Sequence, residues 1–496
     1  MNLMEQCSIW NEKDEFQKII DAIESLPEAE RTPEIICELA RAYNNVNTLG
    51  DGPGDREVYR KAVALLHSVE EKFKDDHSWN FRMAYAYYYL DQEGRALHYF
   101  EKALEARPGD QDTTEYIEDC RHRLALPRFE KTFRDRVEDG WAAFLTGEAK
   151  LRAMMDARED SEALIKQAAD LLSPAFEDIA FELGFKGEKY ELILTPEGDR
   201  TKLFSLVYFE RRAPEAVLEH WNVLVGRQRS NGFSLQAFGT QISAADVQVW
   251  VEQPDDNRNA STVSLALYCE KLLPMLGAEE GHAWWLLSTL LDQVLGEIPA
   301  MELVDGFDVL DTPRKEVGMP LSELLQALTE KGMDLTGDAG RFLEMAYEMK
   351  PEEDPDADLR MDIFAGSSRC VTLINEYLRG DSDRMDTFQQ DGAVPGFIYY
   401  PLGCFSKEEE RGKAILDFRD GLEAAILQTA GADAVSFTGG ASGLYYGYLD
   451  FIAWDLPAVL QAAMDALKDS PMEWAAFHTF RRDVGGVTLM EKSEAE

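Results

Sequence analysis

Apolar side chains in the first 128 residues recur at the spacing of amphipathic helices. The first stripe ends at Pro27 and consists of Phe16, Ile19, Ile20, Ile23 and Leu26. Apolar residues three and four positions apart predict a helix with one buried face. Thr32 and Pro33 then provide the cap and the first turn of a second helix. Between residues 79 and 110, small and aromatic side chains lie one helical turn apart until Pro108. This segment predicts two packed helices joined by a short turn.

The pattern changes to alternation near residue 181. After helices that begin at 129, we expect a hairpin of two strands at 190–195 and 202–209, and a strand at 247–251 with one buried face. The segment 279–295 is apolar nearly all round, which predicts a helix covered on most sides. These elements form the expected central domain, residues 129–315.

Predicted strands and helices interleave from residue 316 onward. The strands are expected at 342–349, 359–365, 396–400, 444–453 and 473–480. The helices are expected at 371–379, 407–429 and 456–468. The acidic stretch 351–358 between the first two strands predicts a solvated loop. The sequence therefore predicts an α+β multidomain protein with domains at 1–128, 129–315 and 316–496, the last two with mainly antiparallel sheets.

The helical pair between residues 79 and 110 resembles a tetratricopeptide repeat. The residues at signature positions are Met83, Ala84, Tyr87, Ala96, Phe100, Ala103 and Pro108. Asn80 departs from the family pattern, because a tryptophan is usual there and Trp79 stands one place early. An earlier repeat matches at Leu39, Ala40, Tyr43 and Ala62, with a glycine-rich insert at 49–55 as an enlarged loop. The resemblance covers about residues 30–125. The remainder resembles uncharacterised bacterial repeat-containing proteins, a likeness that implies no function.

The resemblance implies a concave groove lined by the first helix of each hairpin. It places there Arg41, Asn44, Phe81, Tyr85 and Tyr88. Tyrosine rings suit peptide recognition because they offer a large contact area at low entropy cost. The alternative is that the tyrosines pack against the central domain.

The charge of the chain is strongly negative. Lysine and arginine number 50 against 93 aspartate and glutamate, which gives a formal net charge of −43. This surface disfavours nucleic-acid and anionic-membrane binding and would steer a basic protein partner toward the chain. The alternative to a specific basic partner is a cytoplasmic protein that is acidic without a functional reason.

No local motif predicts a cofactor or a metal. The six cysteines are widely scattered, and none of the seven histidines forms a short metal-binding pair with another histidine or a cysteine. The first ten residues, MNLMEQCSIW, lack the pattern of a signal peptide, and no stretch reaches the ~18 apolar residues of a spanning helix. We therefore expect a cytoplasmic protein without cofactors.

Three polar residues in the third domain stand out. Asp450 lies in a strand whose two faces are both largely apolar, and a buried carboxylate needs a partner. His478 or Arg481 of the last strand is the predicted partner. Such a pair either fixes the strand register or belongs to a ligand or catalytic site. Glycines 439, 440 and 443 predict a turn or a bulge, since a strand rather than a helix follows them.

The function expected from these observations is a protein-interaction scaffold that binds a partner through the groove, without catalysis. A first alternative is an acidic immunity protein or antitoxin that neutralises a basic toxin. A second alternative is an enzyme with its site around Asp450 and His478, which requires those side chains to meet at an open cleft.

Overall fold

The computed structural model describes residues 2–46, 56–230, 232, 234–252, 262–277, 280–341, 345–405 and 410–492. The glycine-rich segment 49–55, expected as a loop, lies outside this part of the chain. The contacts divide the chain into two compact units, Met1–Arg134 with Ala346–Glu496, and Asp135–Met345. The first unit joins two segments that are far apart in sequence. The boundaries of the three predicted domains stay predictions.

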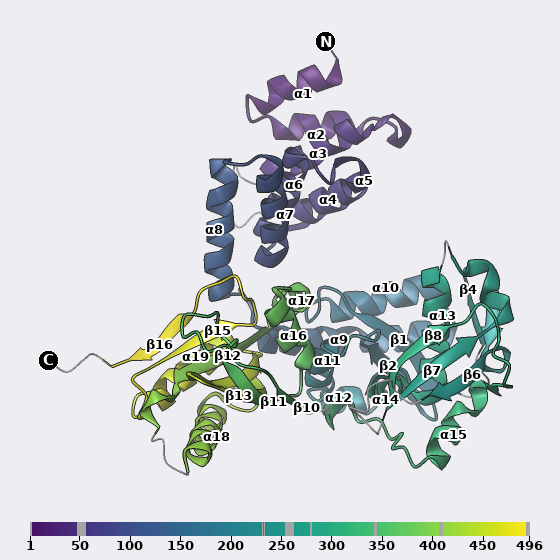
Figure 1. The fold of residues 1–496 in the computed structure, drawn as a ribbon. Helices are drawn as coiled ribbons and strands as arrows, with labels where there is room; N and C mark the ends of the chain where they lie inside the picture. The colour runs from purple at the N-terminus through teal and green to yellow at the C-terminus, as the bar shows by residue number, and fades with distance from the viewer. Residues whose placement is uncertain are drawn as a thin grey trace. The chain divides into compact units, whose positions relative to one another are not determined.

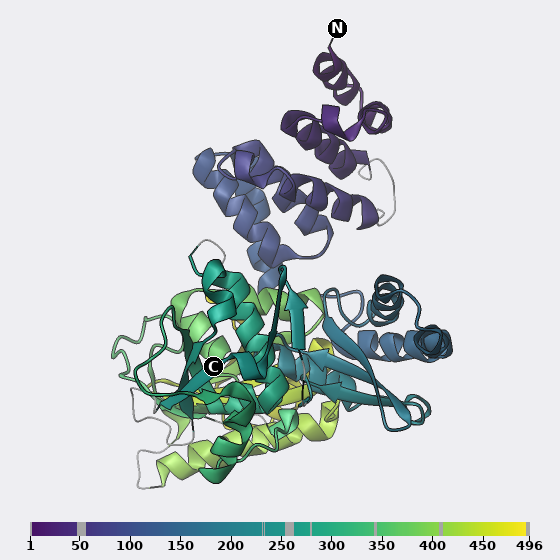
Figure 2. The same cartoon turned by 90° about the vertical axis from the view of Figure 1, so that its right-hand side faces the viewer.

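The first unit begins with helices stacked in chain order (Figures 1 and 2). They are α1 (Leu3–Asn11), α2 (Phe16–Glu24), α3 (Pro33–Val46), α4 (Arg56–His67), α5 (Glu70–Phe73), α6 (His77–Tyr89), α7 (Glu93–Ala106) and α8 (Gln111–Ala125). Short side chains that accept hydrogen bonds cap the N-termini of several of these helices. Asp76 accepts the backbone N–H of Trp79 at the start of α6, and Asp110 accepts that of Thr113 at the start of α8.

Small residues let these helices approach closely. Ala40, Ala62, Ala84 and Ala96, one from each of α3, α4, α6 and α7, are fully buried in one apolar core. Trp79 belongs to the same core and donates its indole N–H to the carbonyl oxygen of Leu66 at 3.1 Å. The early tryptophan therefore joins α6 to α4.

The second part of the first unit is a seven-stranded sheet in the order β10-β11-β13-β14-β12-β15-β16. The strands are β10 (Met345–Glu348), β11 (Ile363–Ser368), β12 (Val394–Pro401), β13 (Val435–Gly443), β14 (Tyr446–Ala453), β15 (Trp474–Thr479) and β16 (Val487–Glu491). The pairings from β11 to β16 are all antiparallel. This confirms the predicted α+β class with a mainly antiparallel sheet.

Helices of the same unit cover this sheet (Figure 1). They are α16 (Val371–Arg379), α17 (Asp383–Gln390), α18 (Arg411–Ala430) and α19 (Leu456–Leu467). Apolar residues of α18 and α19, such as Ile426 and Val459, form one core with Ile398 of β12 and Leu449 of β14. The opposite faces of β12 and β14 carry the polar residues discussed below.

The glycines at 439, 440 and 443 lie within β13, a strand that the sequence analysis did not predict. Its pairing with β14 shifts register between Phe437 and Gly439, which is the predicted bulge. Gly439 has φ +142°, and a Cβ there would overlap the backbone of Ser367 on β11. Glycine is therefore required by the close approach of two strands.

The second unit contains helices and three small sheets. Its helices are α9 (Phe133–Ala157, beginning in the first unit), α10 (Ser161–Leu172), α11 (Lys202–Glu210), α12 (Glu215–Leu218), α13 (Glu280–Leu295), α14 (Glu297–Leu303) and α15 (Leu324–Glu330). Its strands are β1 (Ala180–Lys186), β2 (Lys189–Thr195), β3 (Trp221–Val225), β4 (Ser234–Ala237), β5 (Thr240–Ser243), β6 (Gln248–Glu252), β7 (Val263–Tyr268), β8 (Val304–Val309) and β9 (Met319–Pro320). The sheet orders are β1-β2-β3, β4-β5 and β8-β7-β6-β9, with parallel pairs β2/β3 and β7/β8.

One predicted hairpin in this unit is wrong. Residues 202–209 belong to helix α11, and the partner of β2 is the preceding strand β1. The segment KLFSLVYFE is buried on most sides, including Leu203, Leu206 and Phe209. A short continuous apolar run does not distinguish a buried strand from a buried helix, so its periodicity misled the prediction.

Candidate functional site

Helices α3 and α6 enclose a small pocket. Its volume is ≈ 230 Å³, and it is lined by Arg41, Asn44, Asn45, His77, Ser78, Phe81, Arg82 and Tyr85 of α3 and α6. Four of the five predicted groove residues are in this set. We call this pocket the α3–α6 groove.

Four buried polar atoms of the α3–α6 groove lining lack hydrogen-bond partners among the described residues: Asn44 Oδ1, Arg41 Nε and the two ring nitrogens of His77. Asn44 is 2% exposed; its amide nitrogen donates to the carbonyl oxygen of Arg82 at 2.9 Å, while its oxygen Oδ1 accepts nothing. Arg41 pairs with Glu38, but its Nε–H has no acceptor. A buried polar group without a partner costs free energy, so a ligand that supplies the partners gains affinity.

A cation and aromatic rings complete the groove wall. Arg82 donates to the carbonyl oxygen of Cys37 at 3.1 Å, and burial lowers its pKa. The ring of Phe81 lies 6.4 Å from that of Tyr85 and 5.9 Å from that of Tyr116 on α8. Burial, together with a hydrogen bond to Tyr89, raises the pKa of Tyr85. The lining contains no carboxylate.

Tyr88, the fifth predicted groove residue, does not line the pocket. Its hydroxyl donates to Asp119 Oδ2 at 2.6 Å, and the guanidinium of Arg123 lies 4.6 Å from its ring centroid. Both partners are on α8. Tyr88 therefore attaches α8 to α6, and its predicted contact with a partner stays a prediction. Tyr116 was missed because its contact with α6 depends on how α8 packs, which no local motif encodes.

The three polar residues predicted in the third domain have separate partners. Asp450 binds Arg360 through both oxygens, at 2.7 and 3.1 Å. The two ring nitrogens of His478 contact the carbonyl oxygens of Thr479 and Val484. Arg481 pairs with Asp386 of α17. The predicted pairing of Asp450 with His478 or Arg481 is thus absent.

The strand order explains this correction. Strand β12 lies between β14 and β15, and Phe397 of β12 stands in register with both Asp450 and His478. The ring of Phe397 stacks on His478 at 5.3 Å and lies 4.8 Å from the guanidinium of Arg360. An aromatic ring thus separates the two residues that the sequence analysis paired.

Arg360 is the centre of a buried polar cluster. Arg360 and Asp450 are both fully buried. Tyr347 accepts a hydrogen bond from Arg360 at 3.2 Å, and Tyr448 accepts one from its backbone N–H at 2.9 Å. Tyr448 in turn donates to Asp362 at 2.6 Å. Burial alone would lower the pKa of Arg360, but the adjacent Asp450 carboxylate reverses the effect and raises it. We call these five residues the Arg360 cluster.

The second unit contains another buried arginine. Arg227 contacts four carboxylates: Glu182 at 2.7 Å, Asp292 at 3.5 Å, Glu297 at 3.8 Å, and Glu197. Glu297 is fully buried and also accepts hydrogen bonds from Thr195 and from the backbone of Arg227. Burial and the neighbouring Glu297 raise the pKa of Asp292 to about 7. We call these five charged residues the Arg227 cluster.

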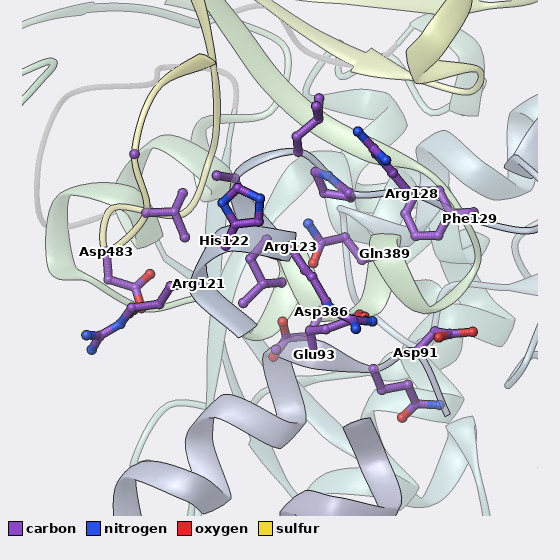
Figure 3. A pocket seen from close by; sticks show the side chains of 18 of the residues that line it. Asp91, Glu93, Arg121, His122, Arg123, Arg128, Phe129, Asp386, Gln389 and Asp483 are labelled. Carbon is purple, nitrogen blue, oxygen red and sulfur yellow. Dashed lines mark ion pairs between the residues drawn. The ribbon is translucent and has the colours of Figure 1, made fainter. Parts of the chain in front are cut away.

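A larger cleft lies in the first unit, with a volume of ≈ 840 Å³. Four segments line it: 91–95, 121–129, parts of 386–390, and 483–487. Figure 3 shows the labelled charged residues around it, with Gln389 between His122 and Phe129 in this view. This volume is within the ~300–1,000 Å³ typical of small-molecule sites.

Searches against models of protein families, curated proteins and solved structures found no match for this chain. Among the described residues, no group of three or more His, Cys, Asp or Glu side chains could hold a metal ion. No described helix is both long and apolar enough to cross a membrane.

Proposed function

We propose that the N-terminal helices form a protein-binding module. An extended segment of a partner protein lies along α3 and α6, with its backbone against Asn44 and Arg41. A side chain of the partner enters the pocket beside Phe81 and Tyr85. The protein then acts as a scaffold whose second surface is supplied by the rest of the chain.

Two of the unsatisfied polar groups in the α3–α6 groove, on Asn44 and Arg41, carry this proposal. Asn44 Oδ1 needs a donor, and Arg41 Nε–H needs an acceptor. A polypeptide backbone offers both, because each non-proline residue has one N–H and one C=O. A simple anion leaves Asn44 Oδ1 without a donor, and a simple cation leaves Arg41 Nε–H without an acceptor. The observation therefore favours a peptide over either kind of ion.

The groove lining also restricts the partner's side chain. Arg41, Arg82 and His77 lie in a pocket without carboxylates, which favours an acidic or amide side chain over a basic one. The aromatic rings of Phe81 and Tyr85 supply the contact area that anchors such segments. The large negative charge of the chain steers partners from a distance and acts separately from this local chemistry.

The test is affinity capture of the full chain's partner from its own cell lysate, followed by titration of the purified partner. We expect Asn44→Ala to weaken binding about threefold to tenfold, the effect of one lost hydrogen bond. Tyr85→Ala should weaken it further. The matched control is Tyr88→Phe, which removes only the hydroxyl that donates to Asp119 and should bind like the unchanged chain. Equal binding by all four proteins would place the site outside the groove.

The salt dependence of the same titration separates the proposed module from an acidic toxin neutraliser. Attraction between exposed charges is screened within ~8 Å at physiological ionic strength, so a toxin complex held by net charge should be lost at high salt. Groove binding through desolvated hydrogen bonds and aromatic contacts should decline only slightly. The enzyme alternative gains no support from Asp450, because that carboxylate is fully buried and bound to Arg360.

A further inference from the structure

The cleft of ≈ 840 Å³ has a chemistry distinct from that of the groove. Its walls come from the start of α7, the end of α8 with the segment after it, the end of α17, and the connection between β15 and β16. All four belong to the first unit. Its polar groups divide into those that have partners and those that have none.

The carboxylates of the cleft are all paired with arginines. Asp91 lies 2.6 Å from Arg56, Glu93 lies 3.5 Å from Arg123, and Asp483 lies 3.9 Å from Arg121. Asp386 pairs with the buried Arg481. Because each acidic group already has a cationic partner, the cleft does not call for a positively charged ligand.

The groups without partners are donors or cations. Arg128 and His122 make no hydrogen bond or ion pair with any residue in the described ranges. Gln389 is 8% exposed, and its amide nitrogen Nε2 has no acceptor in the same part of the chain. A buried amide N–H that lines a cleft and lacks a protein acceptor is available to donate to a ligand oxygen.

An apolar side complements these donors. Phe129 and Val487 pack against the core of the sheet, and Val484 packs against the core of the helices, yet all three line the cleft. In Figure 3, Arg128 and Phe129 lie together on one side of Gln389. Such a cleft fits a molecule with an apolar body and an anionic end.

We propose that this cleft binds a small organic anion, either a carboxylate or a phosphate ester. Arg128 and His122 hold the anionic group, Gln389 donates its unpaired N–H to it, and Phe129 contacts the organic part. The site lies apart from the α3–α6 groove and does not depend on the partner protein proposed above.

The experiment is calorimetric titration of the full chain with a panel of anions at neutral pH. The panel contains inorganic phosphate, succinate, citrate, glucose 6-phosphate and adenosine monophosphate. Saturable binding of an organic member, tighter than that of inorganic phosphate, supports the proposal. Comparison of the carboxylates with the phosphate esters identifies the anionic group. No binding by any member overturns the proposal.

Variants then locate the binding. Arg128→Gln should weaken the best ligand about tenfold, as expected for a lost hydrogen bond to a charged group. Gln389→Glu replaces the donor by a carboxylate of the same shape and should weaken binding further. The control Arg60→Gln alters an exposed arginine of α4 outside the cleft and should change nothing. Because Gln389 is buried, the exposed Arg128 keeps the test valid if Gln389→Glu fails to fold. Binding that is unchanged in Arg128→Gln, or equally weakened in the control, overturns the proposal.

Discussion

The buried arginines Arg360 and Arg227 differ in the number of carboxylates that surround them. Arg360 meets one carboxylate, Asp450, in a fully buried bidentate pair. Arg227 meets four carboxylates, of which Glu197 and Glu182 are partly exposed. The Arg360–Asp450 pair is balanced in charge, whereas the Arg227 cluster has an excess of negative charge. In the Arg227 cluster, burial of Asp292 together with the neighbouring Glu297 raises the pKa of Asp292.

The difference shows that burial of an ion pair does not by itself determine how a region responds to pH or mutation. In the Arg360 cluster, loss of the carboxylate's charge leaves the arginine uncompensated. In the Arg227 cluster, loss of one carboxylate charge removes repulsion between carboxylates. The same chemical change should therefore have opposite effects in the two units.

The largest expected effect is that of Asp450→Asn. The variant leaves the fully buried Arg360 without a counter-charge, which typically costs ~3–5 kcal/mol of stability. Hydrogen exchange measured by mass spectrometry on peptides of β12 and β14 should show this loss, while β6 and β7 of the second unit keep their protection. The double variant Arg360→Met, Asp450→Leu should recover much of the stability, because it buries no unpaired charge. Unchanged exchange in β14 would contradict the assignment of this pair as a structural one.

The second effect is a pH dependence confined to the second unit. The pKa of Asp292 is about 7 in the folded chain, against ~3.9 for an unfolded aspartate. Between these values the folded state holds a proton that the unfolded state has lost, so stability falls as pH rises through this window and is level above it. From about pH 5.5 to about pH 7 we expect a loss of ~2 kcal/mol. Hydrogen exchange of β2 and α13, corrected for the intrinsic effect of pH on exchange, measures it.

The last effect is that of Asp292→Asn at pH above the window. The amide keeps the shape of the aspartate and removes its charge, so at high pH the second unit should gain at least the ~2 kcal/mol that the unchanged chain loses between pH 5.5 and pH 7, and it should gain nothing at low pH. The measurement compares exchange in the variant and the unchanged chain at the same pH, where no intrinsic correction is needed. A loss of stability at high pH would mean that the attraction of Asp292 to Arg227 outweighs its repulsion from Glu297. Removal of a carboxylate charge would then destabilise both clusters, which contradicts the comparison.

The groove was predictable because its signals are local. Ala40, Ala62, Ala84 and Ala96 recur at helical spacing, and their burial brings α3 and α6 together. Once that packing is known, helical spacing places two pairs of residues on the facing sides of α3 and α6. The pairs are Arg41 with Asn44, and Phe81 with Tyr85. The position of Tyr88 outside the pocket was not predictable, because its contacts with Asp119 and Arg123 depend on how α8 packs.

The sites in the sheet were not predictable in the same way. Asp450 and His478 were paired because both lie in strands of one domain, but strand order is a long-range property, and β12 separates them. The sequence did not predict that Arg360 is buried, because this residue follows an acidic stretch that predicts a solvated loop. Arg360 is buried by contacts with Tyr448 and Asp450, which lie about ninety positions later in the sequence. Gln389 likewise becomes notable only when the cleft around it is known.

The interrupted order of the first unit has a consequence for synthesis on the ribosome. Residues 1–134 emerge first, yet the sheet that completes their unit begins at residue 346. At ~5–20 residues per second, the whole of the second unit is made during an interval on the order of 10 to 40 seconds. The nascent helices must therefore remain soluble with their sheet-facing surface exposed throughout that interval. Arg121, which lies 3.9 Å from Asp483 of the β15–β16 connection, is a charged residue on that surface and favours its solubility before the sheet is made.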